Sequence, residues 1–262
     1  MGAEQFALTT PQAKLLSVVQ WGDISWESMR FSFNGASRMS IQAFDQPDLS
    51  GVSDMRGMFA LAAAMNADLS GWDVSAVTDM SLMFVAATAF NQDLSTWDVS
   101  NVTDMSAMFS FASSFDQNIG MWDIRNVTSL FEEGSGNMLS ETGLSPANYD
   151  SLLIGWADLT PLPTGLTLNV GQLPYSLLAS SSRQKLIDAG WTINDGGLTG
   201  GSPFITTWRT TSANETVTIP TGSGADVDDY SFQISWGDGN VESFDGVDDP
   251  NLSHTYTEAG DY

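Results

Sequence analysis

The sequence predicts an α/β solenoid followed by a small all-β domain. Three observations predict this fold class: a 25-residue repeat in the first half, helix and strand signals where the repeat ends, and short β signals after that. Large apolar residues recur at steps of 25: Trp72, Trp97 and Trp122; Met55, Met80 and Met105; Phe59, Phe84 and Phe109. Because one such unit cannot bury its own large side chains, neighbouring units must stack.

Each repeat divides into two halves with different spacing. The unit at 91–115 reads NQDLSTWDVSNVTDMSAMFSFASSF, and a blurred copy begins one residue out of step at Trp21. Alternation over 94–99 predicts a short strand. Apolar residues three and four apart over 103–115 predict a helical turn, with Thr103 as its N-cap. We therefore expect the Trp, Met and Phe columns in the core, in units within the ~20–29 residues typical of leucine-rich-type repeats.

Residues 90–109, FNQDLSTWDVSNVTDMSAMF, resemble the repeat of BspA-like leucine-rich-repeat surface proteins, also called the mycoplasma lipoprotein-type repeat. The resemblance covers residues 15–138. It departs at 46–47, where a Trp would stand, and at 130–136, where the Met-Phe pair is lost, as expected of terminal repeats. The resemblance implies an exported bacterial cell-surface protein that adheres to host or matrix components and has no enzymatic activity.

Residues 139–200 break the period and predict a C-terminal cap of the solenoid. Ser145 and Pro146 mark the start of a helix, and Gly190 marks the end of a second one. Short strands are expected in two places, 166–170 and 191–197. A solenoid end exposes an apolar cross-section, which such a segment covers. The alternative is an independent small domain.

The Gly-rich stretch at 196–203 predicts a domain boundary. The chain then divides into a BspA-like repeat solenoid with an N-terminal lead-in (1–138), its cap (139–200) and a β domain (201–262). Within the β domain, Asp238-Gly239 predicts a tight hairpin turn.

Two motifs of this β domain, WGDG at 236–239 and HTYTEAGDY at 254–262, resemble the polycystic-kidney-disease (PKD) repeat. The resemblance implies an immunoglobulin-like sandwich that serves as a spacer or contacts carbohydrate or protein on exported proteins. In that pattern the last Tyr opens a further strand, so we expect a partial sandwich. The sequence is then a fragment of a larger exported protein, or a neighbouring chain completes the sandwich.

Charge and composition exclude several classes of function. The chain has Lys+Arg 8 against Asp+Glu 32, a net charge of -24, no Cys and one His. Nucleic acid and anionic membrane surfaces require Lys and Arg, so neither is an expected partner. Cysteine chemistry and multi-His metal centres are excluded too. No stretch reaches the ~18 apolar residues of a membrane span, and the N-terminus lacks a signal peptide. As part of a larger exported protein, the chain is expected at the cell surface or outside the cell.

The acidic residues recur with the repeat, which predicts a scaffold role and no enzyme. They form columns: Asp54, Asp79 and Asp104; Asp73, Asp98 and Asp123; Asp68 and Asp93. Glycosidase chemistry needs a single pair of carboxylates, whereas these are copied. His254 has no accompanying G-x-S-x-G nucleophile motif. We therefore expect no catalytic residues and no resident cofactor.

Calcium is the one metal that the sequence suggests, because hard cations prefer several oxygen ligands. The candidate ligands are clustered acids of the β domain: Asp226, Asp228, Asp229, Asp245, Asp248 and Asp249. The alternatives for the acidity are solvated surface carboxylates and adaptation to high salt.

The leading hypothesis is a non-catalytic bacterial surface or secreted binding protein. Its solenoid would adhere to a protein or glycan partner. The alternative is a structural spacer or a filament or appendage subunit, assembled with neighbouring copies of itself through the β-sandwich. A glycosidase ranks third.

Overall fold

The computed structural model describes residues 14–199, 209–218, 231–245 and 253–261. The chain forms two compact units. The first comprises Met1–Tyr175 and Ser181–Gly197, and the second comprises Ser176–Ser180 and Leu198–Tyr262.

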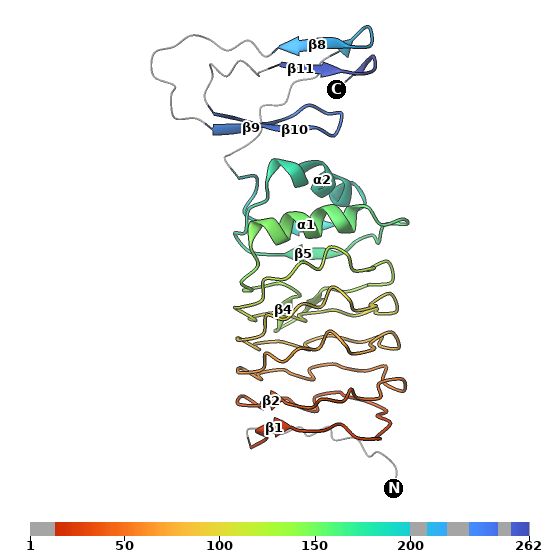
Figure 1. Cartoon of the computed structure of the whole chain (residues 1–262), viewed down its shortest axis with the longest axis vertical. Coiled ribbons are helices and arrows are strands. Elements are labelled where there is room, and N and C mark those ends of the chain that lie inside the picture. The colour runs from red at the N-terminus through yellow and green to blue at the C-terminus, as the bar shows by residue number, and fades with distance from the viewer. Residues whose placement is uncertain (1–13, 200–208, 219–230, 246–252, 262) are drawn as a thin grey trace. The chain divides into compact units, whose positions relative to one another are not determined.

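In the first unit, successive 25-residue repeats stack as coils in sequence order (Figure 1). Single parallel bridges join Asp54 to Asp79, Asp79 to Asp104, and Asp104 to Ser129. The constant step places equivalent residues above one another. At the N-terminal end, strands β1 (Ser17–Val18) and β2 (Ser40–Ile41) pair in parallel.

The residues around each bridge, which we call the bridged segments (54–62, 79–87 and 104–112), have an alternating backbone. In the segment 79–87, four amides donate to carbonyls of the next coil at 2.8–2.9 Å: Met80, Leu82, Phe84 and Ala86. The amides of Met83, Val85 and Ala87 instead close turns onto the third residue before them, at 3.0–3.2 Å. Leu82 and Ala86 adopt φ of 58° and 54°. Every backbone amide from Met80 to Ala87 except that of Ser81 is thus bonded to backbone, and Ser81 N bonds Asp79 Oδ1.

The structure differs here from the predicted strand and helical turn. Between β2 and Phe131 it contains bridges and turns but no helix and no strand of two or more residues. The predicted N-cap role of Thr103 is wrong: its hydroxyl donates to the carbonyl of Thr78 at 3.1 Å. Successive three-residue turns bury residues three and four apart, as a helix does. Because alternate amides bond to the next coil, however, a helix cannot continue.

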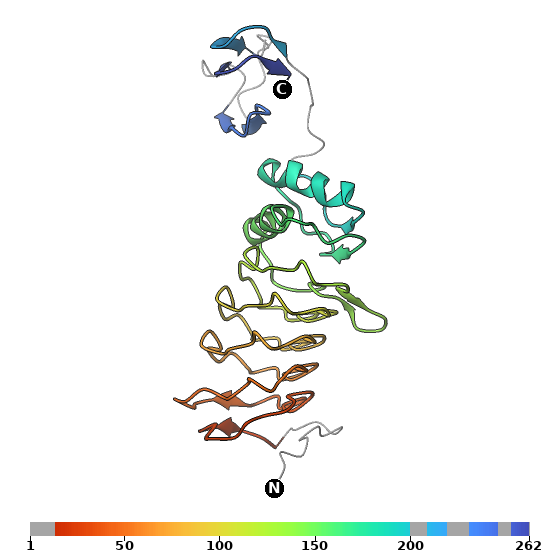
Figure 2. The ribbon, with the colours of Figure 1, turned by 90° about the vertical axis from the view of Figure 1, so that its right-hand side faces the viewer.

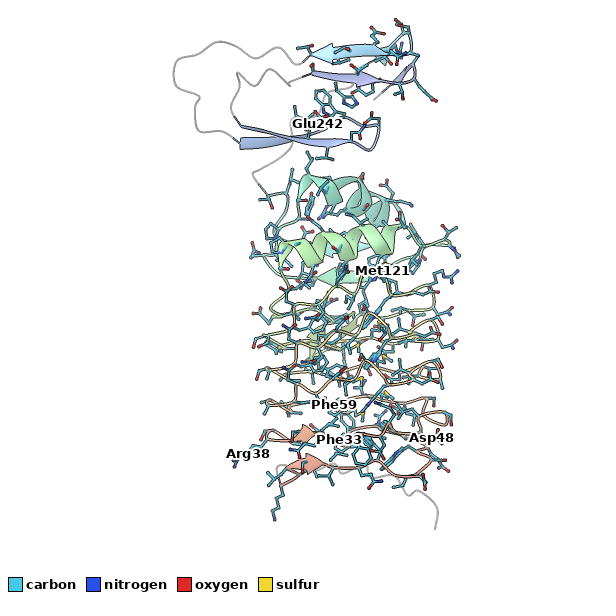
Figure 3. The ribbon with its side chains drawn as sticks, viewed as in Figure 1. Phe33, Arg38, Asp48, Phe59, Met121 and Glu242 are labelled. Carbon is cyan, nitrogen blue, oxygen red and sulfur yellow. The ribbon has the colours of Figure 1, made fainter. Side chains whose placement is uncertain are left out.

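The predicted core columns are confirmed. The Trp, Met and Phe columns are at most 5% exposed from Met55 to Trp122. Phe33, Phe59, Phe84 and Phe109 stack in series with ring centroids 5.5 Å apart, and Figure 3 shows Phe33 and Phe59 inside the stack. The buried Trp97 indole donates its N–H to the Leu69 carbonyl at 3.0 Å, which satisfies its polar atom.

The predicted helices and strands of 139–200 are confirmed. Helix α1 (Pro146–Ala157) is capped by Ser145, whose side chain accepts from the amide of Asn148. Strands β5 (Thr167–Asn169) and β6 (Thr192–Asn194) pair in parallel. The connection between them contains the short 3-10 helix η1 (Leu177–Ala179) and helix α2 (Ser180–Asp188), which ends before Gly190 with φ of 89°.

A hairpin of strands β3 (Phe131–Glu132) and β4 (Gly136–Asn137) interrupts the last coil. The carbonyls that accept from successive coils belong to Met83, Met108 and Met138, at steps of 25 and then 30 residues. Five residues, 131–135, are therefore inserted here. We call residues 131–137 the strap, which Figure 2 shows in green at the side of the stack.

The second unit contains three antiparallel strand pairs within its described residues. They are β7 (Arg209–Thr210) with β12 (Gly260–Asp261), β8 (Glu215–Thr218) with β11 (Ser253–Tyr256), and β9 (Ser231–Ser235) with β10 (Val241–Asp245). Asp238-Gly239 lies in the turn between β9 and β10, as predicted. Gly239 has φ of 93°, which a residue with a side chain rarely adopts.

Candidate binding surface

The predicted calcium ligands do not form a described site. Five of them, Asp226, Asp228, Asp229, Asp248 and Asp249, lie outside the described residues. Asp245 ends strand β10, and its side chain is likewise outside the description. Within the described ranges, no group of three or more His, Cys, Asp or Glu side chains is placed to hold a metal ion. The calcium hypothesis stays a prediction.

Most of the repeated aspartates have a structural role. The carboxylates of Asp48, Asp68, Asp73, Asp93 and Asp98 each accept from the backbone amide two residues further on, at 2.8–3.1 Å. Such Asx turns fix the corners of each coil. These bonds, with the serine side chains as the largest cause, lower the pKa of Asp48, Asp68 and Asp73. The repeated Asp-x-Ser is therefore turn chemistry.

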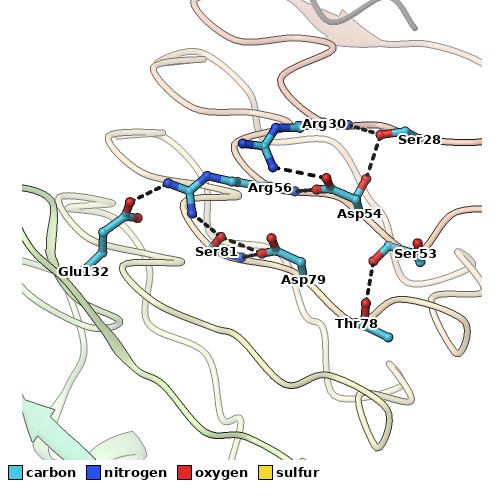
Figure 4. Close-up of polar contacts among 9 residues, drawn as sticks. All are labelled: Ser28, Arg30, Ser53, Asp54, Arg56, Thr78, Asp79, Ser81 and Glu132. Atoms are coloured by element: carbon cyan, nitrogen blue, oxygen red, sulfur yellow. Dashed lines mark hydrogen bonds and ion pairs between the residues drawn. The ribbon is translucent and has the colours of Figure 1, made fainter.

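A column of larger polar side chains runs along the bridged segments. Asp54, Asp79 and Asp104 each accept from the amide two residues on, which places Arg56, Ser81 and Ser106 at equivalent positions. Arg30 of the preceding coil pairs with Asp54 at 3.2 Å (Figure 4). Three of the seven basic residues in 1–202 lie in the first two coils, Arg30, Arg38 and Arg56.

The strap crosses this column and contacts Arg56. Glu132 of β3 forms an ion pair with Arg56 although 76 residues separate them, and the other Arg56 terminal nitrogen donates to Ser81 Oγ at 2.7 Å (Figure 4). The two charged side chains are 20% and 28% exposed. Three coil steps of ~4.8 Å lie between position 56 and the base of the strap. The strap therefore folds back along the stack toward its N-terminal end.

Further bonds fix the strap over buried serines. Ser110 donates its hydroxyl to the carbonyl of Ser135 at 2.8 Å, and Ser106 contacts Ser129 at the base of the strap at 2.7 Å. Ser81, Ser106 and Ser110 are 0%, 3% and 0% exposed. A Cβ at Gly136 would lie 3.2 Å from Ser110 Oγ, so the strap approaches the coils closely. Sequence reasoning saw the repeat depart at 130–136 but interpreted this as a terminal repeat; the step of 30 between Met108 and Met138 is the signal of an insertion.

Exposed apolar side chains lie on the bridged segments and on the strap. Leu61 and Phe111 occupy equivalent places in bridged segments two coils apart and are 53% and 52% exposed, and Phe131 of the strap is 53% exposed. Exposed apolar groups of this size on a water-facing surface are typical of interaction sites when they gather. The bridged segments and the strap together are the candidate binding surface.

Two other polar clusters have structural explanations. In the cap, the Asp195 carboxylate is 2% exposed in its side chain and accepts from Arg183 at 2.7 Å and from the Tyr149 hydroxyl at 2.8 Å. Burial, and then the Asp195 charge, raise the pKa of Tyr149. This cluster joins α1, α2 and the residues after β6, and its carboxylate is buried while Arg183 stays 19% exposed.

His254 lies in strand β11, stacked on Trp236 at 5.0 Å, and its Nε2 bonds Asp238 at 2.7 Å. Partial burial opposes the change, but bonds from His254 and Asn240 lower the pKa of Asp238. Among the described residues, His254 therefore joins strand β11 to the β9–β10 turn through its bond to Asp238.

No helix among the described residues has the length and apolar character needed to cross a bilayer.

Residues 27–140 match a family model described as "Mycoplasma protein of unknown function, DUF285". This is the BspA-like repeat family, so the resemblance of the repeat region is confirmed for that segment. The matched range contains the bridged segments and the strap. No curated protein and no solved structure matches the chain. The PKD resemblance of 201–262 stays a prediction.

Proposed function

We propose that this chain is a non-catalytic bacterial surface or secreted binding protein. Its coil stack, a solenoid of leucine-rich-repeat type, adheres to a protein or glycan partner, and a PKD-like sandwich follows as a spacer. The proposal rests on one observation, the difference within each coil between structural side chains and exposed ones. Repeated side chains form the turns, the bonds between coils and the core, whereas the exposed apolar residues vary: Leu61 and Phe111 are exposed, and the equivalent Ala86 between them is only partly exposed.

The family match supports the same conclusion for residues 27–140, since it joins them to BspA-like repeats. Repeat stacks commonly bind partners through a surface that several repeats share. The acidic charge of -24 favours partners that are not strongly anionic over most of the surface.

The test is retention of the purified chain on an array of immobilised extracellular-matrix proteins and glycans, with released sugars assayed in parallel. We expect saturable binding to at least one member and no release of sugar. The Asp79→Asn and Asp104→Asn variants should likewise release no sugar. Hydrolysis of any glycan would contradict the proposal. Tandem filaments in electron micrographs without array binding would favour the spacer or filament alternative.

A further inference from the structure

We propose that the strap covers a peptide-binding surface of the coil stack, and that an acidic segment of a protein partner displaces it. This inference rests on the proposed binding function, and it names the surface and the class of partner. The strap itself then occupies this surface within the same chain, and its bonds show which chemical groups the surface can bind.

The coil ladder does not need the strap. Met138 donates to the carbonyl of Leu130 at 2.7 Å, which closes the coil on either side of the insertion. The amides of Ala107 and Phe109 bond to Leu130 and Met138 at 3.4 and 2.9 Å, so the ladder continues past it. The five inserted residues are therefore an addition to a stack that is complete without them.

The strap binds through groups that any acidic peptide carries. One is a carboxylate, that of Glu132, which Arg56 holds. The other is a backbone carbonyl, that of Ser135, which accepts from the hydroxyl of Ser110. Gly134 and Gly136 adopt φ of 85° and 95°, which allows the hairpin to lie against the coils.

The arginines make the surface under the strap selective for carboxylates. With Lys+Arg 8 against Asp+Glu 32, most of the surface repels carboxylates. Arg30 and Arg56 stand on adjacent coils in one column, and Arg56 offers a planar guanidinium suited to carboxylates. An acidic glycan also carries carboxylates, but the seated occupant is a peptide and Ser110 bonds its main chain.

Asn137 anchors the base of the strap through Thr167 and Ser140, while residues 131–135 are held on the coils by two bonds, those of Glu132 and Ser135. The Arg56–Glu132 pair is only partly buried, so water and salt screen it more than they would a fully buried pair. The second carboxylate oxygen of Glu132 is buried without a hydrogen-bond partner among the described residues, which weakens the closed arrangement further. A partner that satisfies this surface better can therefore compete with the strap.

The test uses the full chain with residues 131–135 deleted, which joins Leu130 to Gly136 and restores the 25-residue step. The probe is the acetylated and amidated peptide SLFEEGSGNM, residues 129–138. By NMR titration we expect saturable binding that is at least roughly tenfold tighter than to the intact chain, in which the strap occupies the surface. Replacing both peptide Glu residues by Gln should weaken it by about tenfold.

The matched variants are Arg56→Met and Arg125→Met in the deleted chain. Arg125 pairs with Asp123 elsewhere on the stack and is 46% exposed. We expect Arg56→Met to weaken the peptide by about tenfold and Arg125→Met to leave it unchanged. No saturation at millimolar peptide, or equal effects of both variants, would overturn the proposal. Arg56-dependent binding of uronic-acid oligosaccharides without peptide binding would overturn it in favour of a glycan.

A second measurement needs no deletion. A protease that cleaves after Glu is added to the intact chain, and cleavage after Glu132 or Glu133 is followed by mass spectrometry. Arg56→Met should accelerate cleavage by roughly tenfold, while Arg125→Met should not. An unchanged rate in Arg56→Met would show that the pair does not hold the strap. Array binding that persists while the peptide fails would reject this surface and keep the proposed function.

Discussion

At the scale of residues, one position in each coil has a left-handed backbone, and its side chain alternates between large and small from coil to coil. The position with positive φ is occupied by Phe31, Gly57, Leu82 and Ala107 in successive coils. The Phe31 ring covers Gly57, where a Cβ would lie 2.1 Å from a ring carbon. A large side chain thus lies over a small one. The conformation itself does not require glycine, since Leu82 and Ala107 adopt it.

Gly57→Ala should lower the free energy of unfolding by about 1–3 kcal/mol, because the new methyl group overlaps the Phe31 ring. Phe31→Ala removes the overlap, so Gly57→Ala should cost less than about 1 kcal/mol in that background. Urea unfolding of the four chains completes this double-mutant cycle. Equal costs in both backgrounds would show that backbone strain, and not the ring, requires the glycine.

The buried pair in the cap leads to a second residue-scale prediction. Asp195→Asn keeps the shape but leaves Arg183 without its counter-charge, and should lower the free energy of unfolding by about 3–5 kcal/mol. Asp188→Asn is the matched control, because Asp188 is bonded to Gln184 on an exposed helix face. Thermal or urea unfolding measures both. A loss below about 1 kcal/mol for Asp195→Asn would contradict the structural role given to this cluster.

At the scale of elements, helix α1 continues the core of the coils in a different secondary structure. Trp156 of α1 donates its indole N–H to Ile119, as Trp97 and Trp122 donate to Leu69 and Leu94. The helix approaches the preceding coil at two glycines, because a Cβ at Gly155 would lie 2.1 Å from the Gly120 carbonyl oxygen.

Gly155→Ala should therefore separate α1 from the coil and lower the free energy of unfolding by about 1–3 kcal/mol, despite the better helix propensity of Ala. Ile154→Ala, at a neighbouring and partly exposed position of α1, should cost about 1 kcal/mol or less. Circular dichroism during thermal unfolding compares the two. A stabilised Gly155→Ala chain would mean that α1 does not pack this closely.

The elements also show where sequence reasoning works. The columns of Trp72, Met80 and Phe84 are readable because burial repeats with the chain. Ser145 and Gly190 are readable because caps and stops are local signals. The turns over 103–115 are not, since apolar residues three and four apart suit both a helix and a series of turns. The strap could not be predicted from the sequence either, because a single insertion does not recur.

At the scale of the whole molecule, repetition accounts for part of the acidity, because aspartates recur in the turns of successive coils. A carboxylate whose pKa is lowered on folding stabilises the folded state above its unfolded pKa, and this contribution is lost as the pH falls. Folding lowers the pKa of Asp48, Asp68 and Asp73, so these carboxylates act in this direction. Acid also removes the mutual repulsion of a chain with a net charge of -24.

The two effects act in different pH ranges. The melting temperature should rise between pH 7 and about pH 5 as repulsion weakens, and fall below about pH 4 as the turn carboxylates become protonated. Scanning calorimetry over this range measures it. A melting temperature that still rises at pH 3 would show that the Asx turns contribute little.

We propose the bridged segments beside the strap as the adhesive surface of the stack. The most direct measurement is array binding of the double variant Leu61→Asp/Phe111→Asp beside the control Phe44→Asp/Met121→Asp, whose residues are 87% and 80% exposed elsewhere on the coils. We expect at least about tenfold weaker binding for the first variant and unchanged binding for the control. Binding that survives in the first variant and falls in the second would contradict it.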